Sequence, residues 1–118
     1  KDLVVRKSIE KALKRGFVSE TFEQIAEAFV LTEPRYGRKL SQLSGERWRA
    51  SAAIGYASGK KIFYGPYKSS NHYSSMNQLP EIIRFLTAHD CLVILPVGSD
   101  KYIKECVDEC IFIQQKPV

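Results

Sequence analysis

Apolar side chains recur at helical spacing in the first part of the chain. Val5, Ile9 and Leu13 are four residues apart, so they share one side of a helix that we predict over residues 3–15. Gly16 follows this segment, and glycine is the residue that most often ends a helix. We therefore expect a first amphipathic helix with its apolar side against the core.

A second helix is predicted over residues 19–30. Thr21 and Gln24 have the spacing of a capping box, in which each side chain accepts a hydrogen bond from the backbone N–H of the other residue. The apolar residues that follow recur at i, i+3, i+4, i+7 and i+8, the pattern of one buried helix side. They are Phe22, Ile25, Ala26, Phe29 and Val30.

A third helix is predicted over residues 46–58, with Ser44 as its N-cap and Gly59 as its end. Its expected buried side consists mostly of alanine, namely Ala50, Ala53, Ile54 and Ala57. Such small side chains predict close packing against a neighbouring element.

The second half of the chain alternates between short apolar runs and helical patterns. Strands are predicted at 62–64, 91–95 and 111–113, and helices at 80–88 and 100–107. The second of these runs is continuously apolar, as in a strand that is covered on both faces. Strands that alternate with helices indicate a parallel sheet with right-handed crossovers.

The predicted fold class is therefore α/β. Residues 1–59 are expected to form a helical subdomain with the third helix at its end. Residues 60–118 are expected to form a small parallel sheet with crossover helices in the same domain.

The charge of the chain leaves the kind of partner open. The sequence has 118 residues, with 18 Lys and Arg against 13 Asp and Glu, which gives a net charge of +5. A positive surface suits nucleic acid or an anionic membrane. However, the basic residues occur in short scattered pairs, such as Lys14-Arg15 and Lys60-Lys61, which favours an ordinary solvated surface.

The cysteines and the hydropathy point to a cytoplasmic protein. Three cysteines, an odd number, argue against a secreted disulfide scaffold. Neither Cys106 with Cys110 nor His89 with Cys91 has the C-x-x-C spacing typical of zinc sites, so we expect buried, reduced thiols and no metal site. There is no signal peptide pattern and no apolar stretch of about 18 residues, so no direct membrane insertion is expected.

The order of these segments resembles the later part of an ABC-type ATPase domain, the nucleotide-binding domain of ABC transporters, from its helical subdomain onward. Residues 40–46 read LSQLSGE, which is similar to the approach to the LSGGE signature of that family. The predicted strands follow at spacing similar to that of the family. The resemblance implies a RecA-like fold, that is, one half of a P-loop NTPase.

The resemblance implies a nucleotide contact in trans at Ser44, Gly45 and Glu46. In the family this helix start meets the γ-phosphate of ATP held by the opposite subunit. Free N–H groups and the positive dipole end of a helix suit an anion. The same residues also suit an ordinary N-cap, and both interpretations stay open. Trp48, close to the signature, is either a partner contact or a packing residue, and packing is favoured.

The hydrolytic residues of the family are missing. The strand at 62–64 should be followed by Asp-Glu, which hold Mg²⁺ and polarise the attacking water, and Pro-Tyr stands there at 66–67. Pro-Val-Gly at 96–98 replaces the expected switch histidine, and no G-x-x-x-x-G-K-[ST] phosphate loop is present. The chain alone is therefore expected to bind no cofactor and to hydrolyse no ATP.

Two functions of different classes remain. The first is a degenerate, non-hydrolysing ABC-type ATPase domain, or a part of one, that shares ATP with an intact ATPase subunit in a homo- or heterodimer. It would be a partner or regulatory component of an ATP-driven membrane transporter, peripheral at the membrane. The alternative is a basic α/β binding module for nucleic acid or an acidic protein. Salt dependence distinguishes them, because binding to a phosphate backbone weakens steeply with added salt.

Overall fold

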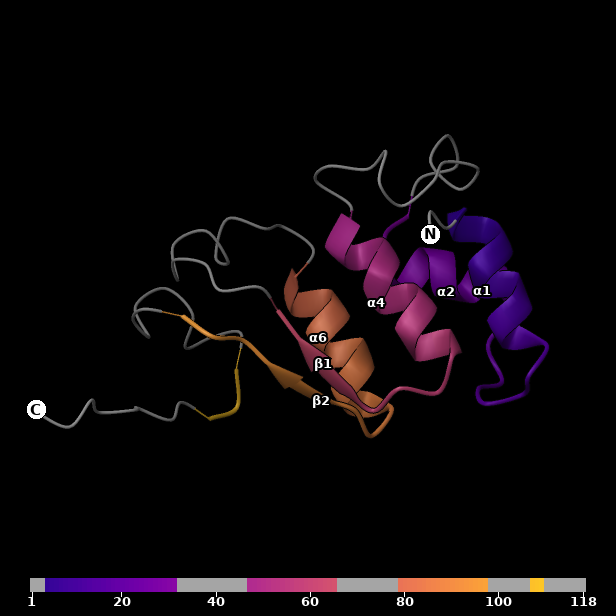
Figure 1. Ribbon diagram of the computed structural model, residues 1–118. Coiled ribbons are helices and arrows are strands. Elements are labelled where there is room, and N and C mark those ends of the chain that lie inside the picture. The colour runs from indigo at the N-terminus through magenta and orange to yellow at the C-terminus, as the bar shows by residue number, and fades with distance from the viewer. Residues whose placement is uncertain (1–3, 32–46, 66–78, 98–106, 110–118) are drawn as a thin grey trace, which may run out of the picture.

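A computed structural model describes residues 4–31, 47–65, 79–97 and 107–109 of the chain. The elements within these residues are α1 (Val5–Leu13), α2 (Phe22–Ala28), α4 (Arg47–Ala57), β1 (Ile62–Tyr64), α6 (Leu79–Ala88) and β2 (Leu92–Ile94). Figure 1 shows α1, α2 and α4 grouped beside the unit formed by β1, α6 and β2. The helices and strands predicted within these residues are confirmed, each to within a few residues of its predicted ends.

The two strands form a parallel pair. Ile62 lies opposite Leu92, and Tyr64 lies opposite Ile94. The helix α6 connects the strands along the chain and packs against β2, as a crossover helix does in α/β proteins. The structure thus has the predicted α/β character, with helices and a small parallel sheet. The predicted strand at 111–113 and helix at 100–107 lie outside the described residues, except for Val107, which is not helical.

The helix α4 lies in the middle of the core. Its alanines at 50, 53 and 57 are fully buried, and α1 and α2 both pack against it. Tyr56 extends the core from α4 towards Phe29, which follows α2, and towards Phe85 on α6. The centroid of the Tyr56 ring lies 6.0 Å from that of Phe29 and 5.1 Å from that of Phe85. This aromatic cluster connects three helices that are distant in sequence.

The ends of α2 follow local backbone chemistry. The Thr21 N–H donates to Gln24 Oε1 at 2.9 Å and the Gln24 N–H donates to Thr21 Oγ1 at 3.2 Å, so the predicted capping box is confirmed. At the other end, Val30 has a φ of 53° and is not helical, although the sequence pattern placed it in the helix. The Leu31 N–H donates to the Ala26 carbonyl at 2.9 Å, which closes the helix in a Schellman motif.

The sheet is covered on only one face by the described residues, which corrects the expectation that the second strand is buried on both. Side chains alternate between the two faces of a strand, and Phe63 and Val93 point towards the helices. The other face, here named the bare sheet face, exposes 50% of Ile62, 66% of Tyr64, 55% of Leu92 and 39% of Ile94.

Trp48 is a packing residue on α4, as the sequence favoured. Its side chain is partly buried against the core, and its Nε1–H donates to the Tyr64 carbonyl at 3.3 Å. The indole therefore fixes the end of α4 nearest the signature-like segment against β1. None of the helices in the described part of the chain combines the length and the apolar content that a bilayer crossing requires.

Candidate functional site

The predicted nucleotide contact at Ser44, Gly45 and Glu46 lies outside the described residues. The described helix α4 begins at Arg47, directly after this segment, so the helix expected to follow the signature is present. The trans contact of these three residues with a nucleotide stays a prediction.

The carboxyl end of the sheet is where parallel α/β proteins usually bind ligands. Here β1 ends in Tyr64-Gly65, and β2 is followed by Leu95, Pro96 and Val97. These described residues offer apolar side chains, one phenol and backbone groups, but no carboxylate and no imidazole. Mg²⁺ prefers oxygen ligands that include carboxylates. This part of the sheet edge therefore contributes no strong Mg²⁺ ligand of its own, and the described residues contain no group of three potential metal ligands.

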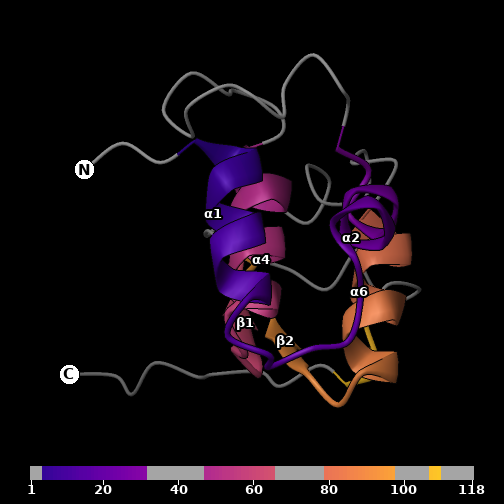
Figure 2. The ribbon, with the colours of Figure 1, turned by 90° about the vertical axis from the view of Figure 1, so that its right-hand side faces the viewer.

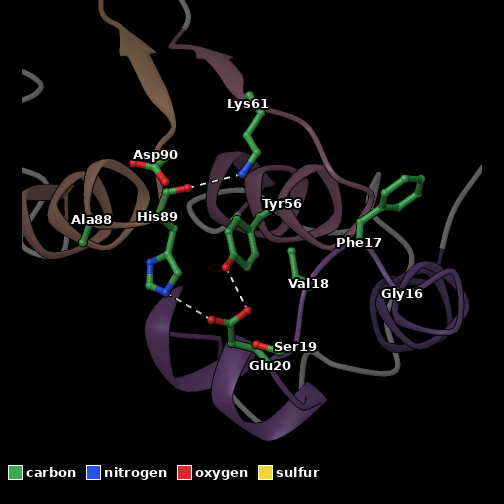
Figure 3. A pocket seen from close by; sticks show the side chains of 10 residues that line it. All are labelled: Gly16, Phe17, Val18, Ser19, Glu20, Tyr56, Lys61, Ala88, His89 and Asp90. Carbon is green, nitrogen blue, oxygen red and sulfur yellow. Dashed lines mark hydrogen bonds and ion pairs between the residues drawn. The ribbon is translucent and has the colours of Figure 1, made fainter.

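An open pocket of about 490 Å³ lies near the amino ends of the strands (Figure 3). The loop 16–20, which connects α1 to α2, forms one side. Tyr56 and Lys61 form a second side of the pocket, and residues 88–90 at the end of α6 form the third. The pocket thus collects residues from three parts of the chain, and most of its polar side chains point towards one another.

Glu20 is the centre of the polar contacts in this pocket. Its side chain is only 16% exposed, and both of its carboxylate oxygens are engaged. The Tyr56 hydroxyl donates to Oε1 at 2.8 Å, and His89 Nε2 lies 3.1 Å from Oε2. On the far side of the imidazole, Nδ1 lies 2.7 Å from the Phe85 carbonyl.

The same contacts indicate a structural role for this network. Both ring nitrogens of His89 face acceptors within the protein, and Lys61 Nζ donates to the His89 carbonyl at 3.3 Å. Neither Glu20 nor His89 is thus left available to act on a substrate in this arrangement. The three side chains of Glu20, Tyr56 and His89, here named the Glu20 network, instead connect the start of α2 to the ends of α4 and α6.

Cys91 does not supply a reactive nucleophile. It is a free, buried thiol beside the Glu20 network, with its Sγ 3.7 Å from the His89 carbonyl and 3.8 Å from that of Lys60. Burial raises the pKa of the Cys91 thiol, against a lowering by Lys61, so the thiolate is disfavoured. The prediction of burial is confirmed for Cys91, while Cys106 and Cys110 lie outside the described residues.

The Glu20 network was not predicted from the sequence. Its members are 33 and 36 residues apart along the chain and fit no motif, because their contact depends on how α2, α4 and α6 pack. The only local signal was the capping box at Thr21, which fixes the start of α2 directly after Glu20.

Comparison with known proteins leaves the family of this chain open. No protein family, no curated protein and no solved structure gives a significant match to it. The resemblance to ABC-type ATPases therefore stays a hypothesis.

The protein is expected to lose stability at alkaline pH, because Tyr56 loses its proton more easily in the unfolded chain than in the folded one. Burial, and then the hydrogen bond to Glu20 and its negative charge, raise the pKa of the Tyr56 hydroxyl above its ordinary value. Above a pH of about 10, the unfolded chain loses this proton while the folded chain keeps it. The folded state therefore loses up to about 1.4 kcal/mol of stability per pH unit in that range.

The measurement is the free energy of unfolding in urea between neutral pH and pH 11, for the native protein and for Tyr56→Phe. The variant lacks the titrating group, so its deficit in stability relative to the native protein should shrink as the pH rises. A difference between the two proteins that is constant over this range would show that Tyr56 is not protected in the folded state.

Proposed function

We propose that this chain is a degenerate, non-hydrolysing ABC-type ATPase domain, or a part of one, that acts as a partner of an intact ATPase in ATP-driven membrane transport. The proposal rests on the resemblance around residues 40–46 and on the order of the elements after it. The helix α4 leads into β1, α6 crosses over, and β2 pairs with β1 in parallel. This is the order expected for the second half of a RecA-like ATPase domain.

The proposal that this domain does not hydrolyse ATP rests on the sequence at the end of β1. Phosphoryl transfer depends on metal ions that neutralise the triphosphate and on a group that positions the nucleophile. Gly65 follows β1 in the structure, and Pro-Tyr follows at 66–67 in the sequence. In the proposed role, an intact partner ATPase supplies the metal ligands for Mg²⁺-ATP that this strand end does not provide.

The bare sheet face supports association with another polypeptide. Parallel sheets are almost always covered on both faces. Here four large side chains, Ile62, Tyr64, Leu92 and Ile94, form an apolar patch on one face, and such contiguous patches typically mark interaction sites. A second layer of structure packed on this face would complete the arrangement that parallel sheets normally have.

The experiment is capture of the tagged full-length chain from its native cells, with and without Mg²⁺ and a non-hydrolysable ATP analogue. The expected result is a nucleotide-dependent complex with a protein that contains an intact phosphate loop. The purified chain alone should show no ATP hydrolysis above the buffer. The proposal is wrong if the chain alone hydrolyses ATP with Mg²⁺, or if its partners lack a phosphate loop and bind equally well without nucleotide.

A further inference from the structure

A lysine stripe runs along the solvent side of α1. The helix buries Val5, Ile9 and Ala12 in the core. Two residues after each of these buried residues comes a lysine, namely Lys7, Lys11 and Lys14. Residues two apart lie on opposite sides of a helix, and all three lysines are exposed. None of the three forms an ion pair with a carboxylate in the part of the chain that the structure describes.

This segment has a local excess of positive charge. Residues 6–15 contain five basic side chains and one carboxylate, a net charge of +4, while the whole chain has +5. Arg6 is engaged elsewhere, since its Nε lies 3.2 Å from Glu10 and its guanidinium also reaches Glu23 at 4.0 Å. The three lysines are therefore exposed basic residues of α1 and its C-cap that pair with no carboxylate among the described residues.

An exposed aromatic ring continues this stripe. Phe17 follows the end of α1 and is 54% exposed, with the Arg15 guanidinium carbon 5.0 Å from the ring centroid. The ring lies against Gly59, where an added Cβ would come within 2.8 Å of it, so only glycine permits this contact. Lys60 follows directly and is exposed. Phe17 thus lies between Arg15 at the end of α1 and the turn at Gly59 and Lys60, which is distant from it in sequence.

We infer that this surface, formed by Lys7, Lys11, Lys14, Arg15, Phe17 and Lys60 and here named the Phe17 surface, binds single-stranded nucleic acid. The lysines contact successive phosphates, and an unstacked base lies on the exposed part of the Phe17 ring. Proteins that bind single strands without sequence preference combine these two features, a basic track and aromatic side chains for stacking. This inference is independent of the proposed role in transport.

The structure favours a single strand over a membrane or a duplex. Membrane-surface helices insert their apolar side into the lipid, but that side of α1, with Val5 and Ile9, is buried against the core. Phe17 is the one exposed aromatic on this surface, and a single ring inserts weakly. In a duplex the bases are already stacked on each other, so the ring would have no base to contact.

The test is fluorescence anisotropy of a labelled oligo-thymidine of about 20 nucleotides, titrated with the full chain. We expect micromolar binding at low salt, in the range of non-specific nucleic-acid binding. With four phosphate contacts, the affinity should fall about 50-fold when the salt rises from 50 to 200 mM. An unlabelled duplex of the same length should compete less well than the unlabelled single strand.

Two variants separate charge from stacking. The triple variant Lys7→Gln, Lys11→Gln, Lys14→Gln should weaken binding at least about 10-fold and flatten the salt dependence. Phe17→Leu should weaken it by about 10-fold with an unchanged salt dependence, because it removes the stacking partner and no charge. The control is Arg84→Gln, which removes an exposed charge on α6, on the other side of the described structure from α1, and should bind as the native protein does (Figure 2).

Circular dichroism and urea unfolding establish that each variant is folded before its binding is compared. The inference is overturned if the native chain does not bind the oligonucleotide at 50 mM salt, or if the triple variant or Phe17→Leu binds as tightly as the native chain. It is also overturned if vesicles of phosphatidylserine and phosphatidylcholine bind the chain through the same lysines while the oligonucleotide does not. That result would assign the surface to lipid headgroups.

Discussion

Replacing Phe29 by alanine is expected to lower the free energy of unfolding by about 3–5 kcal/mol. Phe29 is fully buried, and its ring contacts Phe85 edge-on with centroids 5.4 Å apart and lies 6.0 Å from Tyr56. The truncation removes apolar area and also the contacts that connect α2 to α4 and α6. Because domains of this size are usually stable by about 5–15 kcal/mol, the variant is expected to be marginal.

Urea unfolding followed by circular dichroism provides the measurement, with Phe17→Ala as the matched control. Phe17 is the same residue type but is 54% exposed, so its truncation should cost less than about 1 kcal/mol. Similar losses for the two variants, or a loss below about 1 kcal/mol for Phe29→Ala, would mean that the aromatic cluster does not hold the helices together.

The helices were predictable because their signals are local. The spacing of Val5 and Ile9 identifies the buried side of α1, and Thr21 with Gln24 identifies the start of α2. The end of α2 was placed too late, since Val30 continues the apolar pattern. Its backbone instead adopts a left-handed conformation, which is costly for a β-branched residue and is compensated by the hydrogen bond from Leu31 to Ala26.

The exposure of the sheet was not predictable from the apolar run alone. A continuous run such as Leu92 to Ile94 has the same composition whether a strand is covered on one face or on two. Coverage depends on where the helices lie, and those of the described residues pack on the face of Phe63 and Val93. The run therefore predicted the strand and its parallel partner, but not the bare sheet face.

The polar contacts were unpredictable for a related reason. Glu20 and His89 meet only because α2 and α6 pack side by side, and Phe17 meets Gly59 only because the loop after α1 passes the end of α4. Each partner is an ordinary residue in its own segment. The candidate contact at Ser44 is the reverse case, since a local motif suggested it and its geometry lies outside the described residues.

If the proposed function is right, the variant Ser44→Arg is expected to abolish nucleotide-dependent association with the proposed partner ATPase while the chain still folds. If Ser44 and Gly45 face a nucleotide held by the partner, a large side chain at position 44 occupies the space that the phosphate approaches. It also blocks the N–H groups at the start of the helix. Loss of the predicted cap alone should cost only about 1 kcal/mol of stability, so unfolding does not explain a complete loss of association.

The matched control for this variant is Ser51→Arg. Ser51 is exposed on α4, about two turns after Ser44, so the same substitution there adds the same charge and bulk away from the helix start. Pull-down with and without a non-hydrolysable ATP analogue, together with the ATPase rate of the captured partner, provides the measurement. Ser51→Arg should behave as the native chain and Ser44→Arg should lose the complex. Equal association of both variants would instead identify Ser44 as an ordinary N-cap, because a helix start that no ligand approaches tolerates a long side chain.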